Sequence, residues 1–171
     1  MDLPHPPEIV NRGDESYVGM RRTITMDGFA ELTARIPELF SWLAGRHIEA
    51  AGAPFFRLNV IDMGRQLECE TGIPVADPAF DEAVSDQSLV FDGVLPAGRY
   101  VSYLHAGHPA QLVDVTTAVL AWADNQGLSC DVTPSADGDR WGCRLIVNLS
   151  DPDREPDMSR WQTSLLFRLA D

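Results

Sequence analysis

The sequence contains a similar pattern twice. Tyr17-Val18 begins one copy and Tyr100-Val101 the other, and each pair is followed by an amphipathic stretch with a tryptophan near its end, Trp42 and Trp122. The tyrosines are 83 residues apart and the tryptophans 80. Two copies of a unit too small to bury its own apolar face usually pack together, and the seam between them is a natural place for a ligand cleft.

The first copy predicts a strand, a helix and two more strands. Residues 17–25 alternate in polarity and read as a strand, and apolar residues then recur at helical spacing between Phe29 and Leu43, with Asp27 placed to cap the helix. Pro37 is expected to kink this helix or to begin a second helical piece. Residues 55–62 and 66–71 read as strands around a hairpin turn at Met63-Gly64-Arg65.

The second copy repeats this order. Residues 99–105 read as a strand, Pro109 can occupy the first position of a helix, and Gly127 closes that helix. Residues 141–149 and 161–169 read as the last two strands. Trp42 and Trp122 are interpreted as core or helix-end packing.

These elements predict a single α+β domain over residues 1–171. It consists of two β-α-β-β repeats, about 9–75 and 95–169, joined by a crossover at 76–94 that carries a short strand. The halves 17–75 and 98–169 are expected to superpose around a pseudo-twofold axis. A chain of 171 residues with 44% hydrophobic residues can bury one shared core.

Composition excludes several kinds of protein. No run approaches the roughly 20 apolar residues that span a bilayer, and the N-terminus has no signal-peptide pattern, so a cytoplasmic protein without membrane contact is expected. Cys69, Cys130 and Cys143 lack CxxC spacing, which favours buried free thiols over a disulfide or a zinc site. The formal charge of −13 predicts no direct nucleic-acid partner; it could steer cations or simply maintain solubility.

Two side-chain pairs are candidates for chemistry. Glu68 and Glu70 lie two apart on a strand and therefore share a face, either at a pocket rim or on a solvated surface. His105, which shares a strand face with Tyr103, forms a pair with the nearby His108 and could act as a general base. Because no Ser-His-Asp or Cys-His spacing accompanies it, a hydrogen-bonded structural histidine is the preferred interpretation.

The last two strands divide by parity. Trp141, Cys143, Leu145 and Val147 share one face in residues 141–149, and Thr163, Leu165 and Phe167 share one in residues 161–169. These faces, which are richer in apolar side chains, are expected to pack against the helices. Ile146, Asn148, Ser164 and Leu166 would then project to the pocket side as a mostly neutral floor.

Five short motifs lie along the chain: Leu95-Pro96-Ala97-Gly98-Arg99-Tyr100, His105-Ala106-Gly107, Glu70-Thr71-Gly72-Ile73-Pro74-Val75, Ser150-Asp151-Pro152 and Trp161-Gln162-Thr163. Together they resemble the GyrI-like family, the small-molecule-binding domains found alone or as effector-binding modules of bacterial multidrug-responsive transcription regulators. They occur in the family's order between about Ile9 and Leu169. The resemblance implies an antiparallel sheet with helices on one face and a ligand pocket on the other, without a metal or an organic cofactor.

The sequence departs from the family pattern at its acidic positions. The family often has a carboxylate two residues before an aromatic in the penultimate strand, where this chain has Ile146 and Asn148, and a glutamate at the position of Ser164. A buried carboxylate in an aromatic cage binds organic cations. Its loss predicts that neutral aromatic ligands bind as well as cations, with Glu68 or Glu70 supplying the charge if a cation is preferred.

The leading hypothesis is therefore a stand-alone binding protein for a hydrophobic or aromatic small molecule. The family also contains hydrolases of electrophilic, cyclopropane-bearing natural products and an inhibitor of DNA gyrase, so a hydrolase using Glu70 and an acidic protein-binding module remain as alternatives. No catalytic residue, metal ligand or cofactor is assigned. The predicted ligand-binding residues are Phe56, Glu68, Glu70, Tyr103, His105, Ile146, Asn148, Ser164 and Leu166.

Overall fold

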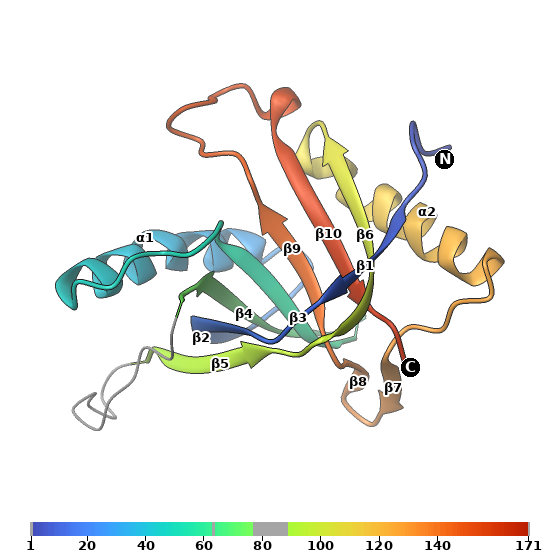
Figure 1. Cartoon of the computed structure of the whole chain (residues 1–171), viewed down its shortest axis with the longest axis horizontal. Helices are drawn as coiled ribbons and strands as arrows, with labels where there is room; N and C mark the ends of the chain where they lie inside the picture. Colours follow the sequence, from blue (N-terminus) through green and yellow to red (C-terminus); the bar gives the residue numbers. More distant parts are fainter. Residues whose placement is uncertain (1, 63, 77–88, 171) are drawn as a thin grey trace.

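The computed structural model describes residues 2–62, 64–76 and 89–170. Ten strands and two α-helices make up these residues (Figure 1). The strands are β1 (Glu8–Arg12), β2 (Glu15–Ile24), β3 (Phe55–Ile61), β4 (Leu67–Pro74), β5 (Phe91–Leu95), β6 (Gly98–Ala106), β7 (Val132–Ser135), β8 (Gly138–Trp141), β9 (Arg144–Asn148) and β10 (Gln162–Arg168). The helices are α1 (Phe29–Gly45) and α2 (Leu112–Asn125), with short 3₁₀ turns at Pro109–Gln111 and Met158–Arg160.

The sheet is antiparallel and internally symmetric. Its order is β1-β6-β10-β9-β3-β4-β2-β5, so β9 and β3 meet at the centre and each half continues outward in the same way. The predicted fold class and repeat order are confirmed. The edge strands are exchanged, because β1 pairs with β6 of the second half and β5 pairs with β2 of the first.

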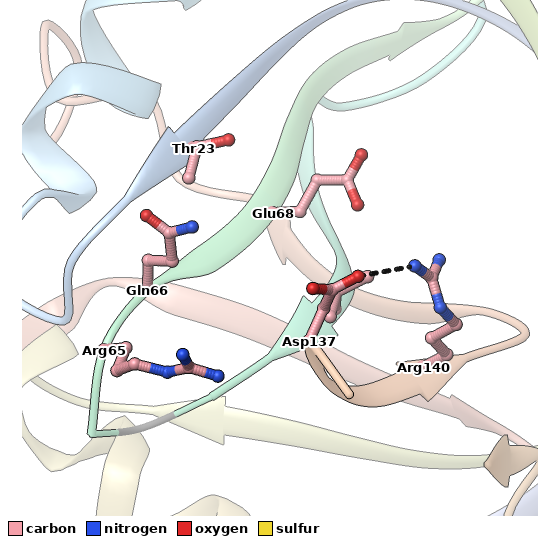
Figure 2. Close-up of a pocket in the computed structure, with 7 residues that line it drawn as sticks. Thr23, Arg65, Gln66, Glu68, Asp137 and Arg140 are labelled. Atoms are coloured by element: carbon pink, nitrogen blue, oxygen red, sulfur yellow. Dashed lines mark hydrogen bonds and ion pairs between the residues drawn. The ribbon is translucent and has the colours of Figure 1, made fainter. Parts of the chain in front are cut away.

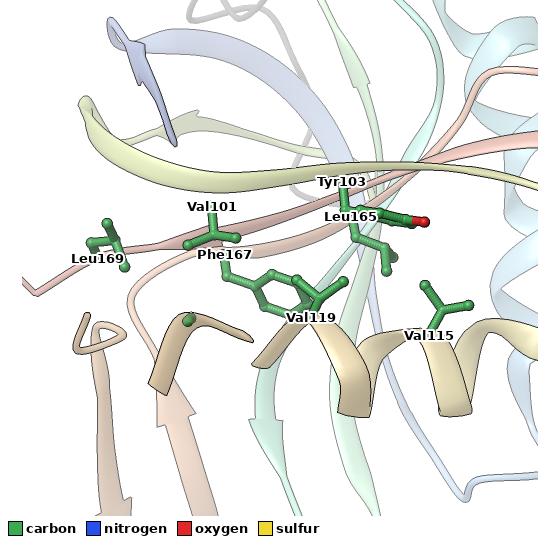
Figure 3. Packing of buried hydrophobic residues seen from close by; sticks show 8 residues of the cluster. Val101, Tyr103, Val115, Val119, Leu165, Phe167 and Leu169 are labelled. Carbon is green, nitrogen blue, oxygen red and sulfur yellow. The ribbon is translucent and has the colours of Figure 1, made fainter. Parts of the chain in front are cut away.

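Both helices cover the same face of the sheet. Val115 and Val119 of α2 pack on Val101 and Phe167 from β6 and β10, as Figure 3 shows. Leu32 of α1 packs on residues of β3 and β4, and farther along α1, Leu39 and Leu43 pack on residues of β2 and β4. Trp141 and Ile146 touch both the α1 and the α2 clusters, so they mark the seam between the two helices.

The opposite face curls inward and holds a core of its own. Tyr17, Phe55, Tyr100, Leu145 and Leu166 are all buried there. Arg57 belongs to the central strand β3, and its Nη1 atom donates a hydrogen bond of 3.4 Å to the carbonyl oxygen of Val94 on the edge strand β5. The sheet is therefore a half-barrel whose interior is filled at its centre by this core.

Some local predictions need correction. Helix α1 begins after Gly28 and has no side-chain cap, so Asp27 does not cap it. The helix continues through Pro37 as one piece. Residues 141–149 are not one strand, because Gly142 and Cys143 separate β8 from β9. The hairpin of β7 and β8, which joins β3, was not expected.

The predicted turn between β3 and β4 is present, with the Arg65 amide donating to the Asp62 carbonyl at 3.1 Å; Met63 lies outside the described residues. Gly127 closes α2 with a φ of +74°, as predicted. Among the described residues, no helix is long and apolar enough to cross a membrane.

Candidate functional site

The predicted ligand-binding residues divide between the two faces of the sheet. Strand register and packing place Glu68, Glu70, Ser164 and Leu166 on the interior face of the half-barrel, and Phe56, Tyr103, His105, Ile146 and Asn148 on the helix face. The sheet itself separates the two groups. The predicted residues therefore cannot all contact one small ligand.

The predicted parity of β9 is wrong. Ile146 pairs with Leu165 and Phe56, which both point to the helices, whereas Leu145 and Val147 pair with Leu166 and Ser164 on the interior face. The bend at Gly142 and Cys143 breaks the alternation that starts at Trp141. In addition, both faces of β9 are packed, so apolar content could not tell them apart.

Glu70 lies at the centre of a buried polar cluster on the interior face. Its side chain is almost fully buried, the Tyr17 hydroxyl donates to Oε1, and Asn59 Nδ2 donates to Oε2 at 2.5 Å. Arg57 Nη1 donates to the Tyr17 oxygen at 3.1 Å, and Arg21 Nη2 lies 3.7 Å from Oε2. We call these five side chains the Glu70 cluster; its donors occupy both carboxylate oxygens.

Burial and the adjacent Glu70 carboxylate raise the pKa of Tyr17 above the ordinary value for tyrosine. The phenol therefore keeps its proton at neutral pH and remains a hydrogen-bond donor.

Glu68 lies beside this cluster but is more exposed. Its Oε1 atom is 3.7 Å from Arg21 Nε, and its side chain lines a hollow of about 370 Å³. Figure 2 shows this Glu68 hollow between β4 and the β7–β8 hairpin. Its lining residues are Thr23, Val60, Arg65, Gln66, Glu68, Asp137 and Arg140. The face shared by Glu68 and Glu70 was predicted correctly.

The hollow carries balanced charges. Arg140 Nη2 is 3.4 Å from Asp137 Oδ2, and Arg65 Nε is 2.8 Å from Asp62 Oδ2 at the rim. Two acidic and two basic side chains line the hollow, so it has no net formal charge. Such a lining can hydrogen-bond a polar group in either direction.

The polar cluster belongs to one half of the molecule only. Tyr17 of the first half pairs with Pro74, and the equivalent Tyr100 of the second half pairs with Arg168. Glu70 lies four residues before Pro74, and Ser164 lies four residues before Arg168, so Glu70 and Ser164 occupy equivalent positions in the two halves. By the same register Arg57 corresponds to Val147. The second half therefore has small and apolar side chains where the first has a carboxylate and a guanidinium.

The helix-face candidates have mainly structural surroundings. Phe56 and Tyr103 are core residues, and the ring of His5 stacks on Tyr103 at 4.4 Å. His105 is buried, with Nε2 3.4 Å from the carbonyl oxygen of His108. Asn148 differs, because its Nδ2 atom is buried without a hydrogen-bond partner in the part of the chain described.

Sequence reasoning missed most partners of the glutamates. The sequence marks Tyr17 only as part of the repeat, and no motif points to Arg21, Arg57 or Asn59 as partners of Glu70. Alternation along β2 and β3 could have placed them on one face, but only the strand order brings them to Glu70. Among the described residues, no group of three His, Cys, Asp or Glu side chains could hold a metal ion.

Comparison with known proteins identifies the fold. No family model matches the sequence, and no curated protein matches it in a sequence search. Solved structures do match. EcmrR in its DNA complex aligns with a TM-score of 0.72 at 14% identity, over 96% of this chain and 57% of EcmrR, so this chain spans little more than half of that protein.

Two further structures match over nearly their whole length. The EcmrR C-terminal domain aligns with a TM-score of 0.69 at 13% identity, covering 99% of both chains. SAV2435, solved with bound tetraphenylphosphonium, aligns with a TM-score of 0.65 at 7% identity, covering 97% of this chain and 94% of SAV2435. The chain therefore shares the fold of these structures, in agreement with the GyrI-like fold that its motifs predict.

Proposed function

We propose that this protein binds a small, neutral aromatic molecule in the Glu68 hollow. The observation that carries the proposal is a hollow of about 370 Å³ with balanced charges beside the buried Glu70 cluster. Volumes of this size suit small-molecule ligands. The fold supports binding of a small aromatic molecule in general, because SAV2435, which has the same fold, has been solved with tetraphenylphosphonium bound.

Charge balance favours a neutral ligand. The Glu70 carboxylate is saturated by Tyr17 and Asn59, and Arg21 lies near both glutamates, so little unpaired negative charge is left for a cation. A buried cation without a compensating charge pays a desolvation cost that aromatic contacts offset only in part. Arg140 can instead donate a hydrogen bond to a ligand oxygen at the hollow.

A size-matched ligand pair tests the preference. Triphenylphosphine oxide is neutral and has a strong acceptor, whereas methyltriphenylphosphonium has the same aromatic body and a positive charge. Titration calorimetry is expected to show the oxide binding at least as tightly as the cation. A cation preference above tenfold would contradict the proposed neutral ligand.

Two variants test the site. Arg140→Gln is expected to weaken oxide binding about tenfold, the size of a charge-assisted hydrogen bond. Glu68→Gln is expected to weaken binding of the cation more than that of the oxide. Glu49→Gln removes the same charge in the exposed loop after α1 and serves as the control. If Arg140→Gln bound the oxide as tightly as the parent protein does, this hollow would be excluded as the binding site.

The Glu70 cluster favours a second candidate, hydrolysis of an electrophilic ligand. A carboxylate in contact with a protonated phenol can accept a proton from water while the phenol donates one to the developing anion. Incubation with an electrophilic cyclopropane would then add the mass of one water. Glu70→Gln and Tyr17→Phe should abolish the addition, and Glu68→Gln should not; no addition by the parent excludes this activity.

A further inference from the structure

Arg144 stands out on the helix face of the sheet, the face opposite to Glu68. It begins β9, and its guanidinium lies over two aromatic rings, 4.9 Å from the Trp141 centroid and 5.4 Å from that of Phe167. Trp141 belongs to the seam between α1 and α2, and Phe167 points toward α2 in Figure 3. The guanidinium is thus held by stacking at one end of the seam.

This guanidinium has no acidic partner among the described residues. It takes part in no hydrogen bond or ion pair there, although ten other arginines of the described chain do. The groups that act on it electrostatically are the thiols of Cys130 and Cys69. Burial raises the pKa of both thiols, that of Cys69 to about 12, so they are neutral at physiological pH.

The missing counter-charge has an energetic consequence. Burial lowers the pKa of Arg144 to about 10, but the side chain still carries its charge at neutral pH. A largely buried charge without a partner destabilises a fold, and stacking on aromatic rings offsets only part of this cost. The side chain nevertheless stays partly exposed, and its nitrogen atoms are not among the fully enclosed unpaired ones, so they keep some contact with solvent.

A second unpaired donor lies on the same face of the same strand. Asn148, whose Nδ2 atom is buried without a partner in the described residues, follows Arg144 by four positions, and Ile146 lies between them. Four residues of strand span about 13 Å. The seam therefore has a cation at one end, an unpaired amide donor at the other and the apolar side chain of Ile146 between them.

We propose that the seam between α1 and α2 binds an organic carboxylate with a flat apolar body. The carboxylate would pair with the fork of Arg144, and the apolar body would lie along Ile146 toward Asn148. A planar guanidinium suits a carboxylate because both can form two parallel hydrogen bonds. A phosphate dianion fits less well, since one guanidinium in an apolar surround cannot balance two charges.

Matched aromatic probes test the carboxylate preference. Binding of 2-naphthoate and of its neutral isostere 2-naphthamide to the parent protein would be measured by titration calorimetry and by quenching of tryptophan fluorescence. We expect naphthoate to bind at least tenfold more tightly. Equal binding, or no binding of either probe below millimolar concentration, would overturn the proposal.

Variants locate the site. Arg144→Met should remove the preference for naphthoate, while Arg160→Met, an exposed control in the loop before β10, should preserve it. Arg144→Lys keeps the charge without the fork and should leave a reduced preference, which provides a readout if Arg144→Met folds poorly. A naphthoate preference that survives in both Arg144 variants would place the carboxylate elsewhere and contradict the inference.

Stability without ligand separates a binding role from a structural one. If Arg144 lacks a partner, Arg144→Met should leave the melting temperature unchanged or raise it. A loss of many degrees would show that the guanidinium has a structural partner, against the proposal. Glu68→Gln should not change naphthoate binding, so this test and that of the Glu68 hollow can fail independently.

Discussion

At the residue scale, two neighbouring glutamates have different surroundings. Glu68 and Glu70 point to the same face of β4, but Glu70 is buried and bonded by Tyr17 and Asn59, whereas Glu68 faces the hollow. Sequence spacing alone makes them alike. Their neighbours in β2 and β3 make Glu70 a buried, hydrogen-bonded carboxylate and leave Glu68 partly exposed at the hollow.

This difference predicts unequal effects of the same substitution on stability. Glu70→Gln places an amide against two donors and removes a buried charge near Arg21, so it should cost about 3 kcal/mol. Glu68→Gln should cost less than about 0.5 kcal/mol, as is usual for exposed side chains. Urea unfolding of both variants measures this; equal losses would show that the Glu70 cluster does not stabilise the fold.

The buried phenols and thiols predict a loss of stability in alkali. Burial raises the pKa of Tyr17, Tyr100 and Cys69, so the folded state keeps protons that the unfolded chain releases above about pH 8.5 for thiols and pH 10 for phenols. Their stabilisation is complete below these values and declines as pH rises. The melting temperature of the parent protein should fall as pH rises from 8 to 11, and that of Tyr17→Phe should fall less steeply. An equal pH dependence in the two proteins would contradict the role of Tyr17.

At the element scale, strand exchange joins the two halves. β1 precedes the first repeat but pairs with β6 of the second, and β5 does the reverse with β2. Val10 of β1 packs into the interior core, whereas Ile9 beside it remains exposed. The edge strand is thus part of the half-barrel core on one face only.

This packing predicts which residue of β1 matters. Val10→Ala should destabilise the protein by about 1.5 kcal/mol through lost burial, and Ile9→Ala by less than about 0.5 kcal/mol. Thermal unfolding of the two variants provides the comparison. If Ile9→Ala were the more damaging change, the assignment of the two faces of β1 would be wrong.

At the scale of the whole molecule, charge limits the partners. The formal charge of −13 opposes contact with a polyanion, since few basic side chains are available to displace the counterions of DNA. We expect no salt-sensitive binding of duplex DNA by this chain. A band shift at physiological salt that weakens as salt is added would refute the expectation.

Much of the fold could be read from local pattern. The repeated tyrosine and tryptophan spacing, the helical periodicity and the turn residues predict two similar halves, because these signals depend on neighbours a few residues away. The common face of Glu68 and Glu70 follows from the same rule. The order of strands around β9 and β3 repeats the expected symmetry.

Only the tertiary structure decided which faces and partners these elements have. β9 is packed on both faces, so the alternation of its side chains does not show which face meets the helices. The bend at Gly142 and Cys143 then reverses the predicted assignment of its two faces. The contact of Arg57 with Tyr17, and the lack of an acid beside Arg144 within the described residues, depend on segments far apart in the chain. Side-chain periodicity is local, whereas the pairing of distant strands and the burial of charge are properties of the assembled sheet.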